Sequence, residues 1–170
     1  MLSSNYSNRL FGRTRGRSKK KINLKNYYET VDKYKFQNFN EETEYILDVG
    51  TGYGETSIFL AKQFPDKVII SCEKYIDGNI ILLKNIENNK IKNILLHNGN
   101  VYDVLKSENK KYFKLIWIFF PDPWPKNRHA KRRLVTSDFL LKLHKKMKEN
   151  SELYIATDSV IYVRFILNSI

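Results

Sequence analysis

From residue 41 onward, short runs of apolar and β-branched residues alternate with stretches in which apolar positions recur at helical spacing. This alternation is typical of β–α–β units, which build a parallel sheet with helices on both faces. The expected strands are residues 45–49, 67–73, 91–97, 115–120 and 152–156. The expected helices are residues 55–64, 77–89, 101–106, about 137–149 and 160–168. The pattern therefore predicts an α/β fold.

Residues 115–120 form the most apolar of the expected strands, which favours a central place in the sheet. Proline follows this run at every second position, as Pro121, Pro123 and Pro125. Proline has no backbone N–H, so neither a strand nor a helix continues through the three positions. We expect a loop here, at the carboxyl end of the strand.

The region before residue 41 has a different character. Eight basic residues lie between Arg9 and Lys25 without an acidic residue among them, and Gly12 and Gly16 interrupt any helix there. This composition indicates a flexible basic arm. We therefore divide the chain into a basic arm with a leading helix, residues 1–40, and a single domain, residues 41–170.

The composition fits one globular domain. A chain of 170 residues, 42% of them hydrophobic, can bury a core without a disulfide or metal. No apolar run approaches the roughly 18 residues that a membrane span needs. One cysteine cannot form an intramolecular disulfide, and residues 1–8 lack a secretory pattern. We expect a cytosolic protein.

The charge balance points to an anionic partner. The chain has 30 Lys and Arg against 18 Asp and Glu, a net charge of +12. Scattered lysines among abundant Asn and Ile also fit biased amino-acid usage and an ordinary solvated surface. The arginines favour nucleic acid, because four of them lie in residues 9–17 and three in residues 128–133. Arg presents a planar fork of donors that suits phosphate oxygens.

Three glycines connect the first expected strand to the first expected helix, a position where α/β sheets bind nucleotides. Their spacing, Gly50, Gly52 and Gly54, differs from the dinucleotide pattern, which requires glycine where this chain has Glu55. With Asp48 just before them, they suit a ligand that carries positive charge and no phosphate. S-adenosylmethionine, which has a sulfonium and an ammonium group, is such a ligand.

Polar residues also follow the next two expected strands. Glu73 ends the second strand, where a carboxylate can accept hydrogen bonds from both ribose hydroxyls. Gly99 and Asn100 follow the third strand and offer an amide to an adenine edge. The ordered set at consecutive strand ends predicts an S-adenosylmethionine site more strongly than any member does alone.

The stretch after the fourth expected strand is the most informative. It reads Phe-Pro-Asp-Pro-Trp at 120–124, followed by a basic cluster. This stretch closely resembles the signature of the TrmB family of tRNA (guanine-N7)-methyltransferases. The resemblance extends to residues 10–17, 47–50 and 156–158. The cations that carry it are Lys126, Arg128, His129, Lys131, Arg132 and Arg133.

The resemblance implies a class I S-adenosylmethionine-dependent methyltransferase with a Rossmann-like sheet, which methylates N7 of a guanine in the variable loop of tRNA. It makes Asp122 the catalytic residue and puts Lys126 and Asp158 at the guanine. It assigns the methyl-donor site to Asp48, Glu73, Asn100 and Asp122, beside the three glycines. It assigns the RNA-contacting loop to Arg128, His129, Lys131, Arg132 and Arg133.

The chemistry of N7 agrees with these roles. Guanine N7 carries a lone pair and no proton, so its attack on a sulfonium methyl needs positioning more than a strong base. The ring becomes cationic, and a carboxylate at Asp122 can stabilise that charge or accept the acidified N1 proton. Trp124 has two interpretations, stacking on the base or packing in the core. The cations around His129 disfavour its protonated form, so it is as well suited to contact phosphate or backbone as to act as a base.

Other candidate residues are read as structural. His97 and His144 have no partner at metal-ligand spacing, so no metal site is expected. Cys72 lies within a strand and is read as a small core residue. The lysines at 142, 145, 146 and 148 cover more than one face of the expected helix, which indicates mainly a solvated surface.

Three departures from the family pattern stand out. Asp48 replaces the more usual Glu, and Ser159 follows Asp158 where an aromatic residue often stands. The sequence ends at Ile170, before the final antiparallel strands and the Thr-x-x-Glu substrate motif that the family pattern contains. Without them we expect one sheet edge and part of the core to be uncovered.

Two alternative functions remain open at this point. An amino-group methyltransferase usually reads Asp-Pro-Pro and then an aromatic residue, whereas this chain reads Asp-Pro-Trp-Pro at 122–125. The other alternative is a truncated, catalytically impaired RNA-binding module that keeps the basic surface.

Overall fold

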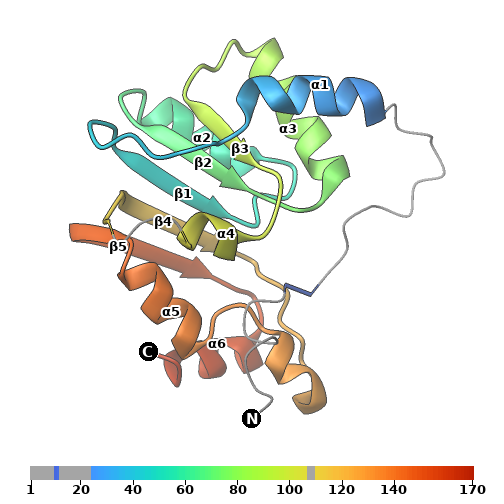
Figure 1. Ribbon diagram of the computed structural model, residues 1–170. Helices are drawn as coiled ribbons and strands as arrows, with labels where there is room; N and C mark the ends of the chain where they lie inside the picture. Colours follow the sequence, from blue (N-terminus) through green and yellow to red (C-terminus); the bar gives the residue numbers. More distant parts are fainter. Residues whose placement is uncertain (1–9, 12–23, 107–109) are drawn as a thin grey trace.

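The computed structural model describes residues 10–11, 24–106 and 110–170. Five strands form one sheet, in which every neighbouring pair is parallel and the order is β3-β2-β1-β4-β5. The expected α/β fold with a parallel sheet is confirmed (Figure 1). The strands are β1 (Tyr45–Val49), β2 (Val68–Cys72), β3 (Ile94–His97), β4 (Phe113–Phe119) and β5 (Met147–Ala156).

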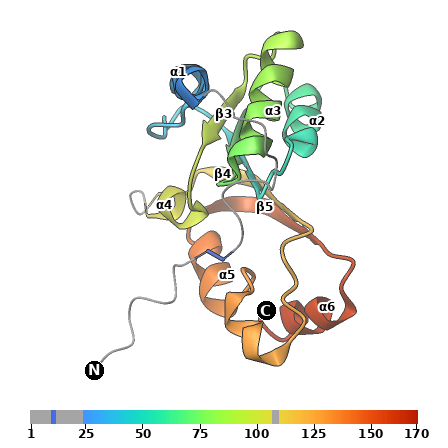
Figure 2. The same cartoon turned by 90° about the vertical axis from the view of Figure 1, so that its right-hand side faces the viewer.

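Helices cover both faces of this sheet, three on each (Figures 1 and 2). One face carries α1 (Leu24–Tyr34), α2 (Glu55–Gln63) and α3 (Ile76–Asn88). The other carries α4 (Val101–Leu105), α5 (Ser137–His144) and α6 (Val160–Leu167). A 3-10 helix, η1 (Asn127–Arg132), lies in the proline-rich connection after β4.

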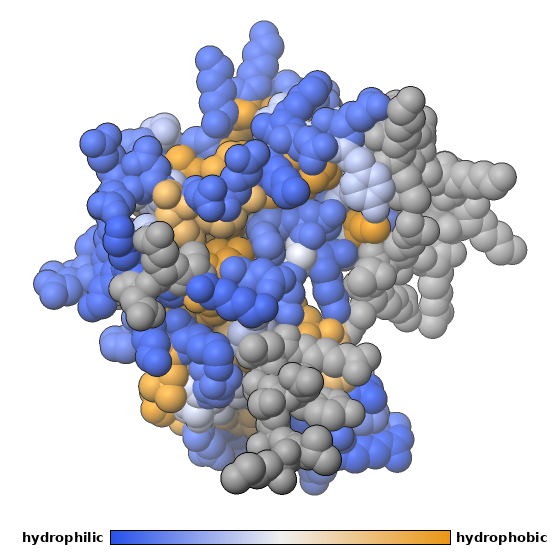
Figure 3. Space-filling view, in the orientation of Figure 1, coloured by the Kyte–Doolittle hydropathy of each residue, from blue (hydrophilic) through white to orange (hydrophobic). Residues whose placement is uncertain are grey.

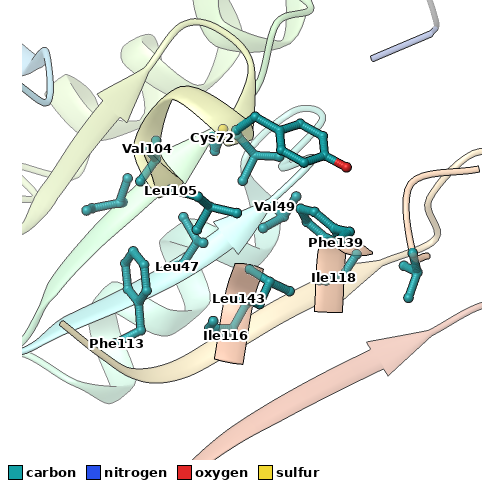
Figure 4. Packing of buried hydrophobic residues seen from close by; sticks show 14 of the residues in the cluster. Leu47, Val49, Cys72, Val104, Leu105, Phe113, Ile116, Ile118, Phe139 and Leu143 are labelled. Carbon is teal, nitrogen blue, oxygen red and sulfur yellow. The ribbon is translucent and has the colours of Figure 1, made fainter. Parts of the chain in front are cut away.

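Two apolar cores lie on the two faces of the sheet. Side chains alternate along β1, so that Leu47 and Val49 join the core under α4–α6 while Ile46 joins the core under α1–α3. Figure 4 shows Phe139 and Leu143 of α5 packed over the first of these cores. Cys72 is buried there, which confirms it as a core residue, and its burial raises the pKa of the thiol.

The middle strand is β1 and not β4. All five residues of β1 are buried, because β2 and β4 flank it and both helical layers cover it. The more apolar β4 is also flanked on both sides, but its Trp117 and Phe119 are only half-buried. Apolar content alone therefore favoured β4 as the central strand, whereas the central strand is its neighbour β1.

The expected helix 137–149 was too long. Helix α5 ends at His144, and β5 begins at Met147 inside a run that reads as a charged helix. The carbonyl of Lys146 accepts hydrogen bonds from the backbone N–H groups of Tyr112 and Phe113, at 2.8 and 3.0 Å, which fixes the chain beside the start of β4. Lys146 is only 5% exposed and so does not belong to the solvated surface expected for it.

Within the described residues, β5 pairs with β4 alone and forms one edge of the sheet. Apolar side chains of β5, including Leu153 and Ile155, line a cavity of about 930 Å³ with α5 and α6. Figure 3 shows that, on the face turned to the viewer, hydrophilic side chains predominate with hydrophobic ones between them.

Two sequence-based expectations are not tested by this fold. The basic arm lies outside the described residues apart from Leu10 and Phe11, and the leading helix corresponds to α1. No helix in the described ranges is long and apolar enough to cross a bilayer. The cytosolic location stays a prediction.

Alanine substitutions at a buried and at an exposed position of α5 should separate the contribution of packing to the free energy of unfolding from that of helix propensity. Phe139→Ala removes a fully buried ring and should lower the free energy of unfolding by about 3–5 kcal/mol. Leu141→Ala, in the same helix at a side chain 62% exposed, is the matched control and should change it by less than about 0.5 kcal/mol. Urea unfolding measures both values, and equal losses would contradict the assigned face of α5.

Candidate active site

A cavity of about 210 Å³ lies where the carboxyl ends of four strands meet. It is lined by Gly50 after β1, Glu73 after β2, Gly99 after β3 and Asp122 after β4. Parallel pairing brings these residues to one edge of the sheet although they are far apart in the sequence. The structure therefore collects most of the predicted donor-site segments around one cavity.

The glycine loop between β1 and α2 has two functions. Gly50, Gly52 and Gly54 all have positive φ, at 74°, 56° and 85°. A Cβ on Gly50 or Gly52 would meet no atom within 4 Å, so their backbone is open to a ligand. A Cβ on Gly54 would lie 2.4 Å from Leu82 Cδ1, so this glycine lets the loop pack against α3.

Sequence reasoning missed a fourth glycine that supports this loop. Gly78 lies in the first turn of α3, and a Cβ there would lie 2.1 Å from the carbonyl oxygen of Gly52. Only a residue without a side chain allows the helix to approach the loop so closely. An isolated glycine inside a helical pattern was the signal that could have found it.

Glu73 connects the second strand end to the same loop. Its Oε2 accepts a hydrogen bond from the Gly52 N–H at 3.0 Å. Its Oε1 accepts from the backbone N–H groups of Lys74 and Tyr75, at 2.8 and 2.9 Å. The carboxylate is thereby held at the wall of the cavity, where the predicted ribose contact requires an acceptor.

Asp48 does not line the cavity, in contrast to the expectation for it. It is 1% exposed and accepts hydrogen bonds from the hydroxyls of Thr56 and Ser57 in α2, both at 2.6 Å. Burial raises its pKa to about 6, although the two hydroxyls act in the opposite direction. Asp48 lies on the α1–α3 face of β1, and its two hydrogen bonds fix the first turn of α2 against this strand.

The side chain of Asn100 also has a structural role, as the N-cap of α4. Its Oδ1 accepts from the backbone N–H of Tyr102 at 3.0 Å and so caps α4. The neighbours on either side, Gly99 and Val101, line the cavity, while Asn100 does not. His97 Nε2 lies 3.0 Å from the Asn100 carbonyl oxygen and fixes this turn. Burial is the main cause that lowers the pKa of His97.

Asp122 lies in the wall of this cavity. Its side chain is exposed, and it shares the cavity with Gly50 and Glu73. The residues two positions away on each side, Phe120 and Trp124, have φ values of 50° and 41°, which are uncommon for large side chains. At the first of these, the Phe120 N–H donates to the Ala156 carbonyl oxygen of β5 at 2.8 Å.

The basic segment after Asp122 divides into exposed and covered cations. Lys126, Arg128 and Lys131 are exposed. Arg132 is half-buried at the cavity, with its guanidinium carbon 4.9 Å from the ring centroid of Trp124 and 5.4 Å from that of Phe11. The Nε of Arg132 is buried and has no hydrogen-bond partner among the described residues.

Arg133 is the exception among the predicted RNA contacts. It is 7% exposed, and its Nε and Nη2 donate to the carbonyl oxygens of Pro123 and Trp124 at 3.0 and 3.2 Å. Its guanidinium carbon lies 4.6 Å from the ring centroid of Phe165 in α6. The expectation that Arg133 contacts RNA is wrong for this conformation, because the guanidinium points into the protein.

Comparison with known proteins identifies the family. A family model described as "Putative methyltransferase" matches residues 42–170. A tRNA (guanine-N(7)-)-methyltransferase from Neorickettsia sennetsu is 35% identical over 164 residues, which are 95% of this chain and 74% of that protein. The chain belongs to the TrmB family of tRNA (guanine-N7)-methyltransferases.

One further relative agrees with membership of the TrmB family, and a solved structure shows the fold. A second protein of the same name, from Wolbachia pipientis, is 37% identical over 84% of this chain and 68% of its own length. Among solved structures, the precorrin-6y C5,15-methyltransferase from Geobacter metallireducens has a TM-score of 0.59 at 13% identity. That likeness covers 90% of this chain and 73% of the other. It shows the Rossmann-like methyltransferase fold of class I, as expected.

The TrmB signature residues Trp124 and His129 lie edge to face, with ring centroids 5.8 Å apart. Trp124 lines the cavity and belongs to neither apolar core, so its position disfavours the interpretation as a core residue. Partial burial, and then the charges of Arg132, Arg128 and Lys126, lower the pKa of His129. This direction disfavours the protonated form of the ring.

Asp158, which the sequence-based expectation puts at the guanine, is exposed between β5 and α6 and does not line the cavity. Ser159, one of the departures from the family pattern, caps α6 by accepting a hydrogen bond from the backbone N–H of Tyr162. Its presence in place of an aromatic residue thus has a local structural reason. No three His, Cys, Asp or Glu side chains converge as metal ligands in the described part of the chain.

The buried Asp48 should make stability depend on pH. Its pKa is about 6 in the folded state against 3.8 ordinarily, so its stabilising effect is complete below about pH 4 and is lost as the pH rises through 6. Asp48→Asn removes this loss. From pH 4 to pH 7 the free energy of unfolding of the original protein should fall by up to about 3 kcal/mol relative to that of the variant.

Urea unfolding at several pH values measures this difference. Asp66→Asn is the control, because that exposed carboxylate has a pKa lowered by its hydrogen bond to Lys67. Parallel pH profiles for the original protein and Asp48→Asn would contradict the buried, proton-binding carboxylate.

Proposed function

We propose that this chain transfers a methyl group from S-adenosyl-L-methionine to N7 of a guanine in the variable loop of tRNA. The observation that carries the proposal is the position of Asp122, which lines the same cavity as Gly50 and Glu73. Trp124 and Arg132 line that cavity too, so a carboxylate, an aromatic ring and a cation are available at one place. Family membership supports the reaction and its substrate.

The residues at the glycine loop fit the methyl donor. Gly50 and Gly52 leave open space at their Cα atoms, and Glu73 presents a carboxylate beside them. Gly99 and Val101 offer backbone and an apolar surface for an adenine ring. When bound, S-adenosyl-L-methionine supplies a methyl carbon made electrophilic by its sulfonium sulfur. Asp48 and Asn100 act on this site through the loop and helix that they hold.

In the transfer step, Asp122 stabilises the positive charge that develops on the guanine ring and does not remove a proton from it. The N7 lone pair of guanine forms the new N–C bond while the C–S bond breaks and its electron pair stays on sulfur. Positive charge therefore passes to the guanine ring, and a carboxylate beside the ring stabilises it. N7 has no proton to remove, so the step needs no general base, and His129 is not required as one.

The substrate contacts are assigned to side chains that follow Asp122 in the chain and to Asp158. We assign stacking on the guanine to Trp124 and contacts with the guanine to Lys126 and Asp158. The exposed side chains of Arg128 and Lys131, with His129 and the half-buried Arg132, form the surface that we assign to RNA phosphates. Charge and exposure support these assignments, and the closeness of the β4 and β5 ends supports the role of Asp158.

Methyl transfer to unmodified tRNA tests the proposed reaction. We expect incorporation into a transcript with guanine in the variable loop, at N7, and none when that guanine is replaced by adenine. Incorporation at an exocyclic amine would instead identify an amino-group methyltransferase. Retention of tRNA without incorporation would identify a catalytically impaired RNA-binding module.

Replacing Asp122 tests the role of its charge. Asp122→Asn keeps the size of the side chain and removes the carboxylate, so turnover should fall by about 100-fold or more while tRNA affinity stays within about twofold. Asp138→Asn, at an exposed carboxylate of α5 outside the cavity, is the matched control. Radiolabelled methyl transfer and filter binding measure the two quantities. Unchanged turnover in Asp122→Asn would contradict the charge argument.

A further inference from the structure

A buried guanidinium connects two segments of the active site. Arg133 follows η1, and its fork donates to the carbonyl oxygens of Pro123 and Trp124. Both carbonyls lie directly after Asp122 in the chain. The basic segment thus turns back and binds the backbone that carries the carboxylate.

The backbone around Asp122 needs such support. Phe120 and Trp124 both have positive φ, a region that large side chains rarely occupy and that persists only when surrounding contacts impose it. At Phe120 the contact is the hydrogen bond to Ala156 of β5. At Trp124 the hydrogen bonds from Arg133 have the same effect. Each strained end of the segment is thereby held by a different part of the fold.

The other side of Arg133 rests on α6. Its guanidinium carbon lies 4.6 Å from the ring centroid of Phe165 and 5.9 Å from that of Tyr162. The Tyr162 hydroxyl accepts a hydrogen bond from the backbone N–H of Val135 at 3.0 Å. Helix α6 therefore contacts the segment 133–135 through both Tyr162 and Phe165. Since α6 begins just after Asp158, these contacts join the segment of Asp122 to the segment of Asp158.

Lysine could not make this set of contacts. The Nε and Nη2 atoms of Arg133 reach two successive carbonyl oxygens while the flat guanidinium packs on an aromatic ring. A lysine has a single nitrogen and a strongly hydrated charge. Arg133→Lys therefore keeps the charge of the site and removes the fork.

We propose that Arg133 is a positioning residue for methyl transfer, which fixes the segment 122–124 against α6 and does not contact RNA. The proposal rests on the proposed function, because Asp122 is the carboxylate that Arg133 positions. It separates two arginines of one basic cluster, since Arg128 is exposed whereas Arg133 is buried.

Kinetics on the full chain test the division between the two arginines. At saturating tRNA and methyl donor, Arg133→Lys should lower the single-turnover rate at least about tenfold, because a small displacement of a reacting group is costly. Its tRNA dissociation constant should stay within about twofold, with an unchanged salt dependence. Arg128→Gln should instead weaken tRNA binding and lower the salt slope by about one. Weakened tRNA binding by Arg133→Lys with an unchanged saturating rate would overturn the proposal.

A second measurement does not depend on activity. In a Trp117→Phe background Trp124 is the only tryptophan, so acrylamide quenching of fluorescence reports its exposure. We expect Arg133→Lys to increase this quenching, whereas Arg128→Gln should leave it unchanged. Unaltered quenching in a folded Arg133→Lys protein would overturn the positioning role. Absence of methyl transfer by the original protein would refute the proposed function and leave this test intact.

A third variant tests the same contact with a substitution that perturbs the fold less. Phe165→Leu removes the ring under the guanidinium and keeps all hydrogen-bonding groups of the segment. It should lower the saturating rate and increase Trp124 quenching in the same direction as Arg133→Lys, by a smaller factor. The thermal unfolding curve of each variant gives the fraction that is folded at the assay temperature. A folded Phe165→Leu protein with the original rate and quenching would overturn the link to α6.

Discussion

Parallel pairing of β1 with β2 on one side and β4 on the other is the constraint on which the active site depends. It brings four strand ends to one edge, and backbone hydrogen bonds continue past the strands. The Gly50 N–H donates to the Cys72 carbonyl oxygen at 2.8 Å, and the Glu73 N–H to that of His97 at 3.1 Å. A slip of one residue in this register would turn Glu73 away from the cavity, because side chains alternate across the sheet.

The site contains two kinds of residue: those exposed in the cavity, and buried ones that fix the position of the exposed residues. Asp48 and Asp122 are both carboxylates after or within neighbouring strands, yet one is buried under hydroxyls and the other is exposed in the cavity. The same division separates Arg133 from Arg128. Gly78 belongs with the supporting groups, because it gives α3 room against the glycine loop. Rigid support of this kind lets an exposed loop present a charge in one place.

Most of the fold could be predicted because its pattern is local. Strand β1, the glycine loop and helix α2 each follow from a run of about ten residues, and the structure agrees within one residue at their ends. The boundary between α5 and β5 could not be predicted in this way. The polar run from Lys145 to Glu149 has no strand pattern, and it becomes extended only because Lys146 and Met147 pair with the start of β4.

The sequence by itself determined the order of strands and helices, the residue types at each strand end and the motif around Asp122, because spacing and chemistry are properties of the chain. Only the tertiary structure decided that Asp48 and the Asn100 side chain serve as supports and that Arg133 faces inward while Arg128 faces water. Those orientations depend on Thr56, Tyr102 and Phe165, partners brought into contact by packing, and no local pattern records which neighbour a side chain will meet.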